Sequence, residues 1–259
     1  MLVQTPRGIS DKTASGIGTE RGGLNLEIYN LYHDGFLVRT GTHTLIFDYY
    51  PGKQSAGGLR DGMIDPQELR DENVVVFASH RHPDHFSREI LDWRENLPQV
   101  RYVLSDDIRT GEDVHKMGPG AVLDLGDVWV RTLESTDEGV AFLVKTDGVC
   151  LYHAGDLNWW DWEGEPPRAR ELMGQRYREQ IDLLRGEKID VAFLPADSRL
   201  EKSYLLGMDY FMRTVGADFV VPMHFWDDYA VCTRLQNEEQ TADYRNQIAS
   251  YAKRGQRIL

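Results

Sequence analysis

The segment NVVVFASHRHPDHF, residues 73–86, joins an apolar run to a dense group of metal-binding side chains. The apolar half is short, continuous and rich in valine, which predicts a strand buried on both faces. His80, His82, Asp84 and His85 follow it directly, at the predicted carboxyl end of the strand, where sites in α/β folds usually lie. A single residue of this kind is usually a solvated loop residue, but the density of the group predicts a metal site.

Strand patterns occur on both sides of this segment. Residues 24–50 alternate apolar runs with the turn signals HDG and TGTH, which predicts antiparallel strands that end at Asp48. A helix is expected directly after the metal-binding group, with Ser87 as its N-cap. Strand-like runs separated by Gly and Asp then return at residues 101–105, 128–134, 140–146 and 149–155.

The last third of the chain predicts helices that alternate with strands. Apolar residues at spacings of four, four and three predict an amphipathic helix within residues 166–187, with Gly186 as its stop. The further expected elements are a strand at 190–196, a helix around 207–216, a strand at 218–224 and a final helix around 237–254. Two blocks of strands with helices outside them predict two packed sheets in an α/β fold.

Length and composition favour one globular domain. The chain has 259 residues, and we expect a single domain over residues 24–259. Residues 1–23 are rich in Gly, Ser and Thr without a helical or strand period, which predicts an N-terminal arm. The formal net charge of -13 argues against general binding to nucleic acid, whose phosphates require a basic surface.

The sequence also bears on the compartment. The N-terminus lacks the apolar core of a signal peptide, and no apolar run approaches the roughly 20 residues of a membrane helix. Only two cysteines occur, which fits a reducing compartment better than secretion. We therefore expect a cytoplasmic protein without a membrane partner. The motifs of dinucleotide-binding proteins, P-loop proteins and serine hydrolases are missing from the sequence, which argues against these three classes.

The His-x-His-x-Asp-His motif after an apolar strand resembles that of the metallo-β-lactamase superfamily of metal-dependent hydrolases. In that family a later strand end supplies a bridging Asp, commonly in a Gly-Asp pair, and a late strand ends in a further His. Gly155-Asp156 and His224 follow apolar runs here in that order. The resemblance covers roughly residues 24–226 and implies the family's four-layer αββα sandwich.

One position departs from the family pattern. The family usually carries another metal-binding His where this chain reads LESTDEG, residues 133–139. Asp137 is the first candidate to replace it, because a carboxylate oxygen is a competent hard ligand. Thr136, Ser135 and Glu138 are weaker candidates.

The resemblance implies a centre for one or two divalent metal ions. One ion would be bound by His80, His82 and Asp137, a second by Asp84, His85 and His224, and both by the bridging Asp156. Two ions about 3.5 to 4 Å apart can lower the pKa of a shared water and present hydroxide to a carbonyl or phosphoryl centre. Asp84 would also orient that hydroxide, which makes it the expected catalytic residue. The donors are all nitrogen and oxygen, which suits Zn, Mn or Fe without selecting among them.

Aromatic residues cluster near the expected ligands. Trp159, Trp160 and Trp226 are expected to flank the cavity as an apolar wall for a small-molecule substrate, although core packing is the alternative for each of them. His33 resembles a position that lies near the metals in lactonase-like branches of the family. A structural histidine that caps its turn is an equal alternative.

The sequence thus predicts a cytoplasmic metal-dependent hydrolase of unknown substrate and oligomeric state. The second hypothesis is a catalytically weak, mononuclear metal-binding or regulatory protein on the same fold, because the usual third His is missing. A nuclease comes third, since the sequence lacks a basic, aromatic-rich stripe for a polynucleotide.

Overall fold

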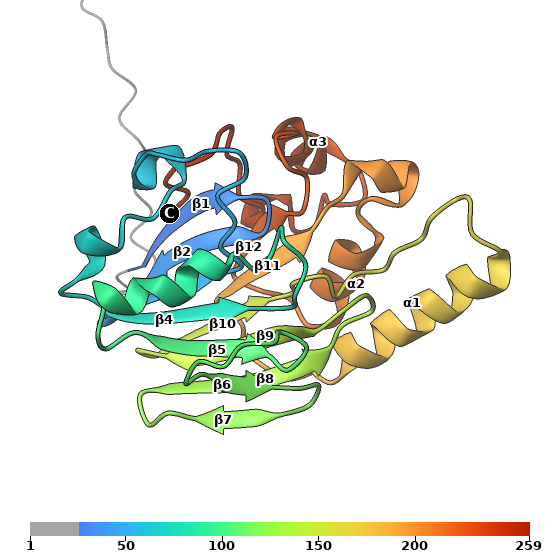
Figure 1. The fold of residues 1–259 in the computed structure, drawn as a ribbon. Coiled ribbons are helices and arrows are strands. Elements are labelled where there is room, and N and C mark those ends of the chain that lie inside the picture. Colours follow the sequence, from blue (N-terminus) through green and yellow to red (C-terminus); the bar gives the residue numbers. More distant parts are fainter. Residues whose placement is uncertain (1–25) are drawn as a thin grey trace, which may run out of the picture.

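The computed structural model describes residues 26–259, so the predicted arm at residues 1–23 lies outside the described residues. Two sheets of six strands pack face to face, with helices on their outer faces (Figure 1). This arrangement confirms the predicted four-layer αββα sandwich. Within the described range, no helix has the length and apolar character needed to span a membrane.

The first sheet contains the N-terminal strands in sequence order. Its strands are β1 (Glu27–Tyr32), β2 (Gly35–Arg39), β3 (His43–Phe47), β4 (Asn73–Ala78), β5 (Arg101–Ser105) and β6 (His115–Met117). The first three strands are antiparallel, and β3 to β6 run parallel to one another. The carboxyl ends of β3 and β4 therefore meet at one edge.

The second sheet has the order β12-β11-β10-β9-β8-β7. Its strands are β7 (Val122–Asp124), β8 (Val128–Glu134), β9 (Val140–Thr146), β10 (Val149–His153), β11 (Val191–Pro195) and β12 (Phe219–Met223). Strands β7 to β10 are antiparallel, whereas β10, β11 and β12 are parallel. The loops that follow β10, β11 and β12 therefore leave from the same edge.

The α-helices are α1 (Pro167–Asp182), α2 (Leu206–Thr214) and α3 (Ala230–Asn237). Shorter 3-10 helices occupy Leu59–Asp61, Pro66–Leu69, Arg88–Glu95, Ser198–Ser203 and Arg245–Gln247. The helix expected after Ser87 is thus present as a 3-10 helix with Ser87 at its N-cap position.

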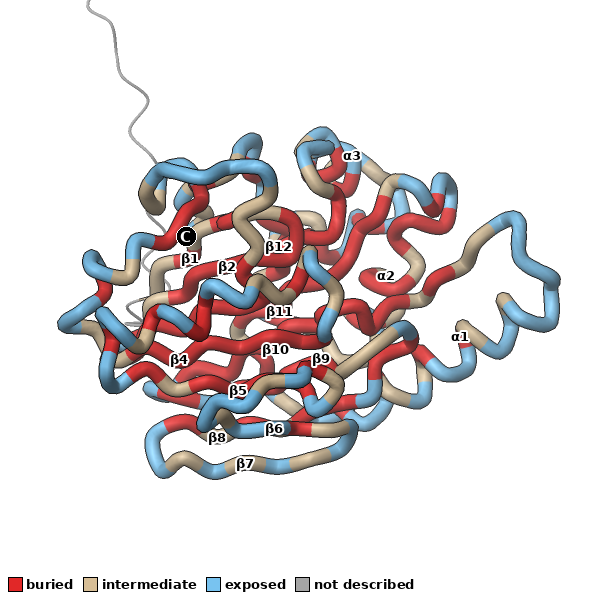
Figure 2. Tube along the Cα trace, in the orientation of Figure 1, coloured by how far each residue is buried: buried red, intermediate tan, exposed pale blue. Residues whose placement is uncertain are grey.

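Strand β4 is buried on both faces, as its valine-rich sequence predicts (Figure 2). Val75 and Phe77 point into the core between the two sheets. Val74 and Val76 point the other way and pack in a second apolar cluster, with residues from the 3-10 helix Arg88–Glu95. Because both faces are covered, the polar residues that follow β4 leave the core only at the carboxyl edge.

The final helix predicted around residues 237–254 is wrong. Helix α3 ends before this segment, and Glu238 adopts an extended backbone. The segment instead runs back along the second sheet, where Ile248 forms a parallel bridge with Val220 and Ala249 N donates to Val220 O at 2.7 Å. Pairing with the open edge of β12 therefore outweighs the local helical pattern, as tertiary contacts often do.

Candidate metal centre

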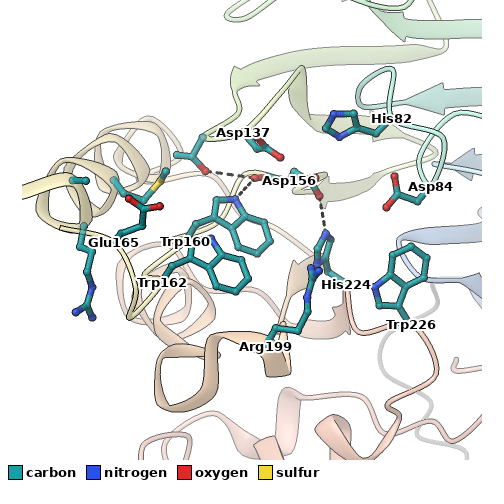
Figure 3. Close-up of a pocket in the computed structure, with 14 residues that line it drawn as sticks. His82, Asp84, Asp137, Asp156, Trp160, Trp162, Glu165, Arg199, His224 and Trp226 are labelled. Carbon is teal, nitrogen blue, oxygen red and sulfur yellow. Dashed lines mark hydrogen bonds and ion pairs between the residues drawn. The ribbon is translucent and has the colours of Figure 1, made fainter. Parts of the chain in front are cut away.

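The predicted metal-binding residues meet at the carboxyl edges of the two sheets. His80, His82 and His85 follow β4, Asp156 follows β10, and His224 follows β12. His80, His85, Asp156 and His224 are buried, and His82 is half-buried. Figure 3 shows His82, Asp156 and His224 around the same cavity. Because they share this cavity, residues that are far apart in the sequence can act on one ligand.

Asp156 lies between two groups of histidines. Its Oδ2 atom is 3.4 Å from His80 Nε2, and His80 Nε2 is 3.0 Å from His82 Nδ1. Its Oδ1 atom is 3.4 Å from His85 Nε2 and 3.3 Å from His224 Nε2. We call His80, His82 and Asp156 the outer group, and His85, His224 and Asp156 the inner group. Each carboxylate oxygen of Asp156 therefore faces a different group.

The chemistry of both groups fits a divalent metal ion. His85 Nε2 and Asp156 Oδ1 are buried and have no hydrogen-bond partner among the described residues. Buried polar atoms without partners are uncommon, and a bound ion or water can supply the missing partner. In the outer group, two imidazole nitrogens converge with a carboxylate oxygen, an arrangement that suits a cation.

Asp48, which sequence analysis assigned only to a strand end, supports ligands of both groups. Its Oδ1 accepts the backbone N–H of Ser79 at 2.7 Å, and its Oδ2 accepts the Ser79 hydroxyl at 2.6 Å. The same Oδ2 lies 2.9 Å from His85 Nδ1, while Ser79 Oγ lies 3.0 Å from His80 Nδ1. Holding a proton on Nδ1 leaves the Nε2 lone pair of each histidine free for a metal.

The pKa values of His80 and His85 are shifted in opposite directions by their different neighbours. Burial lowers the pKa of His80 to about 4, so this ring is neutral at physiological pH. Burial also opposes charge on His85, but the carboxylates of Asp156 and Asp48 outweigh it and raise the pKa of His85 to about 10. The inner group is therefore an anionic pocket that favours a positive charge.

His224 has its own carboxylate partner. Its Nδ1 lies 3.1 Å from Asp197 Oδ2, which again directs Nε2 toward Asp156. Arg199 Nε lies 2.9 Å from both oxygens of Asp197. Burial opposes ionisation of Asp197, but its hydrogen bonds with His224 and Arg199 hold its pKa at about 2. The Asp197 carboxylate is thus a charged support for the ligand.

His33 lies at the candidate metal centre, in the turn between β1 and β2. Its ring stacks on Trp226 with centroids 3.8 Å apart and lies 4.4 Å from the His224 ring. The backbone N–H of Trp226 donates to His33 Nδ1 at 3.4 Å, which assigns the proton of the neutral ring to Nε2. Burial lowers the pKa of His33 well below its usual value, so the ring is neutral. Its Nε2–H faces Asp84, whose Oδ2 lies 3.8 Å away.

Asp84 and Asp137, two predicted ligands, line the cavity but lie outside the inner and outer groups. Asp137 is exposed as a whole residue, but partial desolvation of its carboxyl together with the charge of Asp156 raises its pKa. The other candidates for the missing histidine have different contacts. Glu138 Oε2 lies 3.4 Å from His82 Nε2, Thr136 donates to Asn158 O at 2.6 Å, and Ser135 Oγ accepts the Asp137 N–H.

The cavity beside these groups has a volume of about 390 Å³. Trp160, Trp162 and Trp226 supply its apolar walls, and Arg199 reaches it from the 3-10 helix Ser198–Ser203 that follows β11 (Figure 3). Met173 adds to the apolar lining. Trp160 is also fixed in place, because its Nε1–H donates to Asp156 O at 3.0 Å.

Trp159 does not line this cavity. Its ring packs against Tyr177 and Tyr210 and lies against Gly174 of α1. Adjacent residues here point to opposite sides of the chain, so Trp160 reaches the cavity while Trp159 joins the packing between α1 and α2. The expectation that both rings flank the cavity is corrected to Trp160 alone.

Comparisons with known proteins identify similar sequences. Residues 27–160 match the family described as Beta-lactamase superfamily domain. A UPF0173 metal-dependent hydrolase from Methanoregula boonei is 23% identical over 216 residues, covering 75% of this chain and 81% of that protein. A second UPF0173 metal-dependent hydrolase, from Thermococcus kodakarensis, is 27% identical over 140 residues, covering 49% and 59%.

The fold is also similar to that of a solved structure. A metallo hydrolase from Ignicoccus hospitalis superposes with a TM-score of 0.58 at 16% identity, covering 90% of this chain and 97% of that one. At this identity the likeness concerns the fold alone.

Proposed function

The chain belongs to the beta-lactamase superfamily, and from this membership we propose that it is a metal-dependent hydrolase of a small-molecule substrate. The observation that carries the proposal is the position of Asp156, whose two carboxylate oxygens face the outer and inner groups separately. The names of the relatives from Methanoregula boonei and Thermococcus kodakarensis support it. One or two divalent ions, Zn, Mn or Fe, would suit the nitrogen and oxygen donors.

The residues that would hold the ions follow from the two groups. His80 and His82 would bind one ion and His85 and His224 another, with Asp156 between them. Bound divalent ions lower the pKa of water, so that it can attack a carbonyl or phosphoryl centre at neutral pH. Asp48 and Asp197 keep the ligand imidazoles oriented through hydrogen bonds to their Nδ1 atoms.

Asp84 is the proposed catalytic residue. Its carboxylate lines the cavity and is partly exposed, so it can accept a proton from the attacking water. The neutral His33 presents its Nε2–H toward the same place and can donate a hydrogen bond to Asp84 or to a substrate oxygen. The pair would orient the reacting groups beside the metal ligands.

The cavity walls limit the kind of substrate. Trp160, Trp162 and Trp226 offer flat apolar surfaces, which suit a ring or a short acyl chain. The hydrogen bond with Asp197 and the charge of that carboxylate raise the pKa of the Arg199 guanidinium, and the charges of Asp156 and Asp84 add to the effect. We therefore propose an ester, lactone or phosphoester that carries an acidic group near the bond to be cleaved.

The test combines metal analysis with a substrate panel. Protein purified without chelator is analysed by plasma mass spectrometry and assayed on esters, lactones and phosphodiesters, beside His82→Ala, His224→Ala and Asp84→Asn. We expect bound metal and turnover in the wild type, and less metal in both histidine variants. Asp84→Asn should fold normally and lose about 10² to 10⁴ of the rate.

Two outcomes would contradict the proposal. Full activity in a correctly folded Asp84→Asn variant would remove Asp84 from catalysis. Bound metal without turnover on the whole panel would favour the mononuclear, non-catalytic alternative, which the absence of a histidine at residues 133–139 motivates.

A further inference from the structure

We propose that Asp34 is the fourth ligand of the inner metal ion, in the place that the family resemblance assigns to Asp84. The inner site would then consist of Asp34, His85, Asp156 and His224. The inference rests on the proposed function only for the presence of a metal, and it does not depend on turnover.

The first argument is the environment of the Asp34 carboxyl. Asp34 is fully buried in the turn between β1 and β2, and neither of its oxygens has a hydrogen-bond partner among residues 26–259. Its nearest ionisable contacts are His33 Nδ1 and His85 Nδ1, each 3.9 Å away. A buried carboxylate without partners is costly, and such groups are normally paired or bound to a metal.

The second argument is convergence. One donor atom from each of Asp34, His85, Asp156 and His224 lies within 4.8 Å of the other three. Neighbouring donors of a tetrahedral four-coordinate ion are separated by about 3.3 to 3.6 Å when each bond is about 2.0 to 2.2 Å long. Small side-chain shifts would therefore bring all four donors onto one cation. Among the polar atoms of these residues, His85 Nε2 and Asp156 Oδ1 also lack hydrogen-bond partners in the described structure.

His33 is the rival for the fourth position, because it also lies close to His85 and His224. A neutral imidazole has one lone pair, and that of His33 is on Nδ1, which accepts the Trp226 N–H. Its Nε2 therefore carries a proton and cannot ligate. The carboxylate of Asp34 has no such restriction.

Asp84 is a weaker candidate for a different reason. Its side chain is 27% exposed, and it belongs to none of the groups of converging donors in the described chain. Its Oδ2 lies 3.8 Å from His33 Nε2, which is beyond hydrogen-bond distance but places the free carboxylate next to a donor. This position suits a base better than a buried ligand.

His153 fixes Asp34 relative to the bridging aspartate. Its Nε2 donates to the backbone oxygen of Asp34 at 2.9 Å, and its Nδ1 accepts the backbone N–H of Gly155 at 3.2 Å. The turn that carries Asp34 and the loop that carries Asp156 are therefore tied through one buried ring. The resulting inner site has two imidazoles and two carboxylates, a harder set that favours Mn or Fe over softer metals.

The test measures metal binding in Asp34→Asn and Asp84→Asn. Both substitutions keep the side-chain volume and remove one carboxylate, so each is the control for the other. Affinities for Mn²⁺ and Zn²⁺ are measured by competition with a chromophoric chelator, and stoichiometry by plasma mass spectrometry. We expect Asp34→Asn to lower the affinity for one of the bound metal ions by at least about 100-fold. This loss is larger than the effect expected when a group that only supports a ligand is removed. Asp84→Asn should bind both metals as the wild type does.

Two readouts separate a ligand from a structural acid. Metal should raise the unfolding temperature of the wild type and of Asp84→Asn more than that of Asp34→Asn, while the metal-free variants unfold at similar temperatures. Unchanged metal affinity in Asp34→Asn, or loss of one equivalent in Asp84→Asn instead, would overturn the inference.

Crystals of the wild type grown with Mn²⁺ decide the question even if a variant fails to fold. Anomalous scattering from the metal should place it in bonding contact with an Asp34 oxygen. Bonding to Asp84 with Asp34 left free would overturn the inference. Failure of the proposed function looks different, because it would leave an Asp34-bound metal and no turnover.

Discussion

The Nδ1 atom of His85 lies 2.9 Å from the Oδ2 atom of Asp48, so the residue directly after β3 orients a ligand that follows β4. Strands β3 and β4 are parallel neighbours, and Asp48 N also donates to Phe77 O at 3.0 Å. The support for the ligand loop is therefore built into the strand pairing.

Replacing Asp48 by Asn should weaken metal binding by about 10- to 100-fold, because the variant loses the acceptor that sets the proton on His85 Nδ1. Chelator competition measures this change. Asp190→Asn is a matched control, since Asp190 Oδ2 accepts the Cys150 N–H at 2.7 Å on the strand end opposite the site. Equal metal affinity in wild type and Asp48→Asn would refute the orienting role.

Gly139 packs against the loop that carries the outer ligands. It has a φ of 69°, and a Cβ at this position would collide with Ser79 O and lie 2.5 Å from the His80 Cβ. Gly139→Ala should therefore displace His80 and weaken metal binding by the outer group. It should also lower the unfolding temperature. Gly148→Ala is the control, because Gly148 also has a positive φ, of 75°, but a Cβ there would meet no other atom within 4 Å.

The comparison of the two alanine variants separates strain from collision. Gly148→Ala should show only the cost of the backbone conformation, about 1 to 3 kcal/mol, and bind metal normally. If both variants bind metal equally well, the close approach of Gly139 to the ligand loop has no role in the site.

Arg199 should select acidic substrates. Arg199→Gln should raise KM for a substrate with a carboxylate or phosphate near the reacting bond by about 10-fold or more, with little effect on a neutral analogue. Arg199→Lys should recover part of the difference, since it keeps the charge but not the planar fork. Because Arg199 also bonds Asp197, the metal content of each variant is measured in parallel. Equal losses for acidic and neutral substrates would show that Arg199 acts only through Asp197 and His224.

Sequence reasoning finds the part of the site that is concentrated in one segment. His80, His82 and His85 stand out because they lie within one six-residue stretch just after a buried strand, and Asp156 and His224 follow similar strands. The family pattern then supplies their order. These signals are local, so they can be recognised without knowledge of the tertiary contacts.

The buried acids were missed because they occupy ordinary positions in the sequence. Asp34 stands in a turn and Asp48 at a strand end, where aspartate is common for reasons of backbone geometry. Only the packing of the two sheets shows that both carboxyls are fully buried next to His85. Likewise, the sequence cannot tell that Trp159 and Trp160 point to opposite sides, because irregular loops have no fixed period.

A second group of charges joins the sheets at the end opposite the metal centre. His43 at the start of β3 lies 2.9 Å from Asp147 Oδ2 and 3.0 Å from Asp127 Oδ2, in the turns β9–β10 and β7–β8. Asp147 also accepts hydrogen bonds from Thr40 Oγ1 at 2.5 Å and from Thr42 N at 2.8 Å. One carboxylate thus connects the edge of the first sheet to a turn of the second.

Asp147 should make stability depend on pH. Burial opposes its ionisation, but its hydrogen bonds with Thr40, Thr42 and His43 hold the pKa of Asp147 well below the usual value of 3.8. A depressed pKa gives stability that is present above the unfolded value and is lost as pH falls below it. Asp147→Asn should therefore lower the free energy of unfolding by about 1 to 2 kcal/mol at pH 7, and this difference should shrink as the pH falls below about 4.

Urea unfolding of the metal-free proteins at several pH values measures this difference, and metal-free samples remove the effect of ligand protonation. A difference between wild type and variant that stays constant from pH 7 to pH 3 would show that the Asp147 carboxylate contributes no charge-dependent stability.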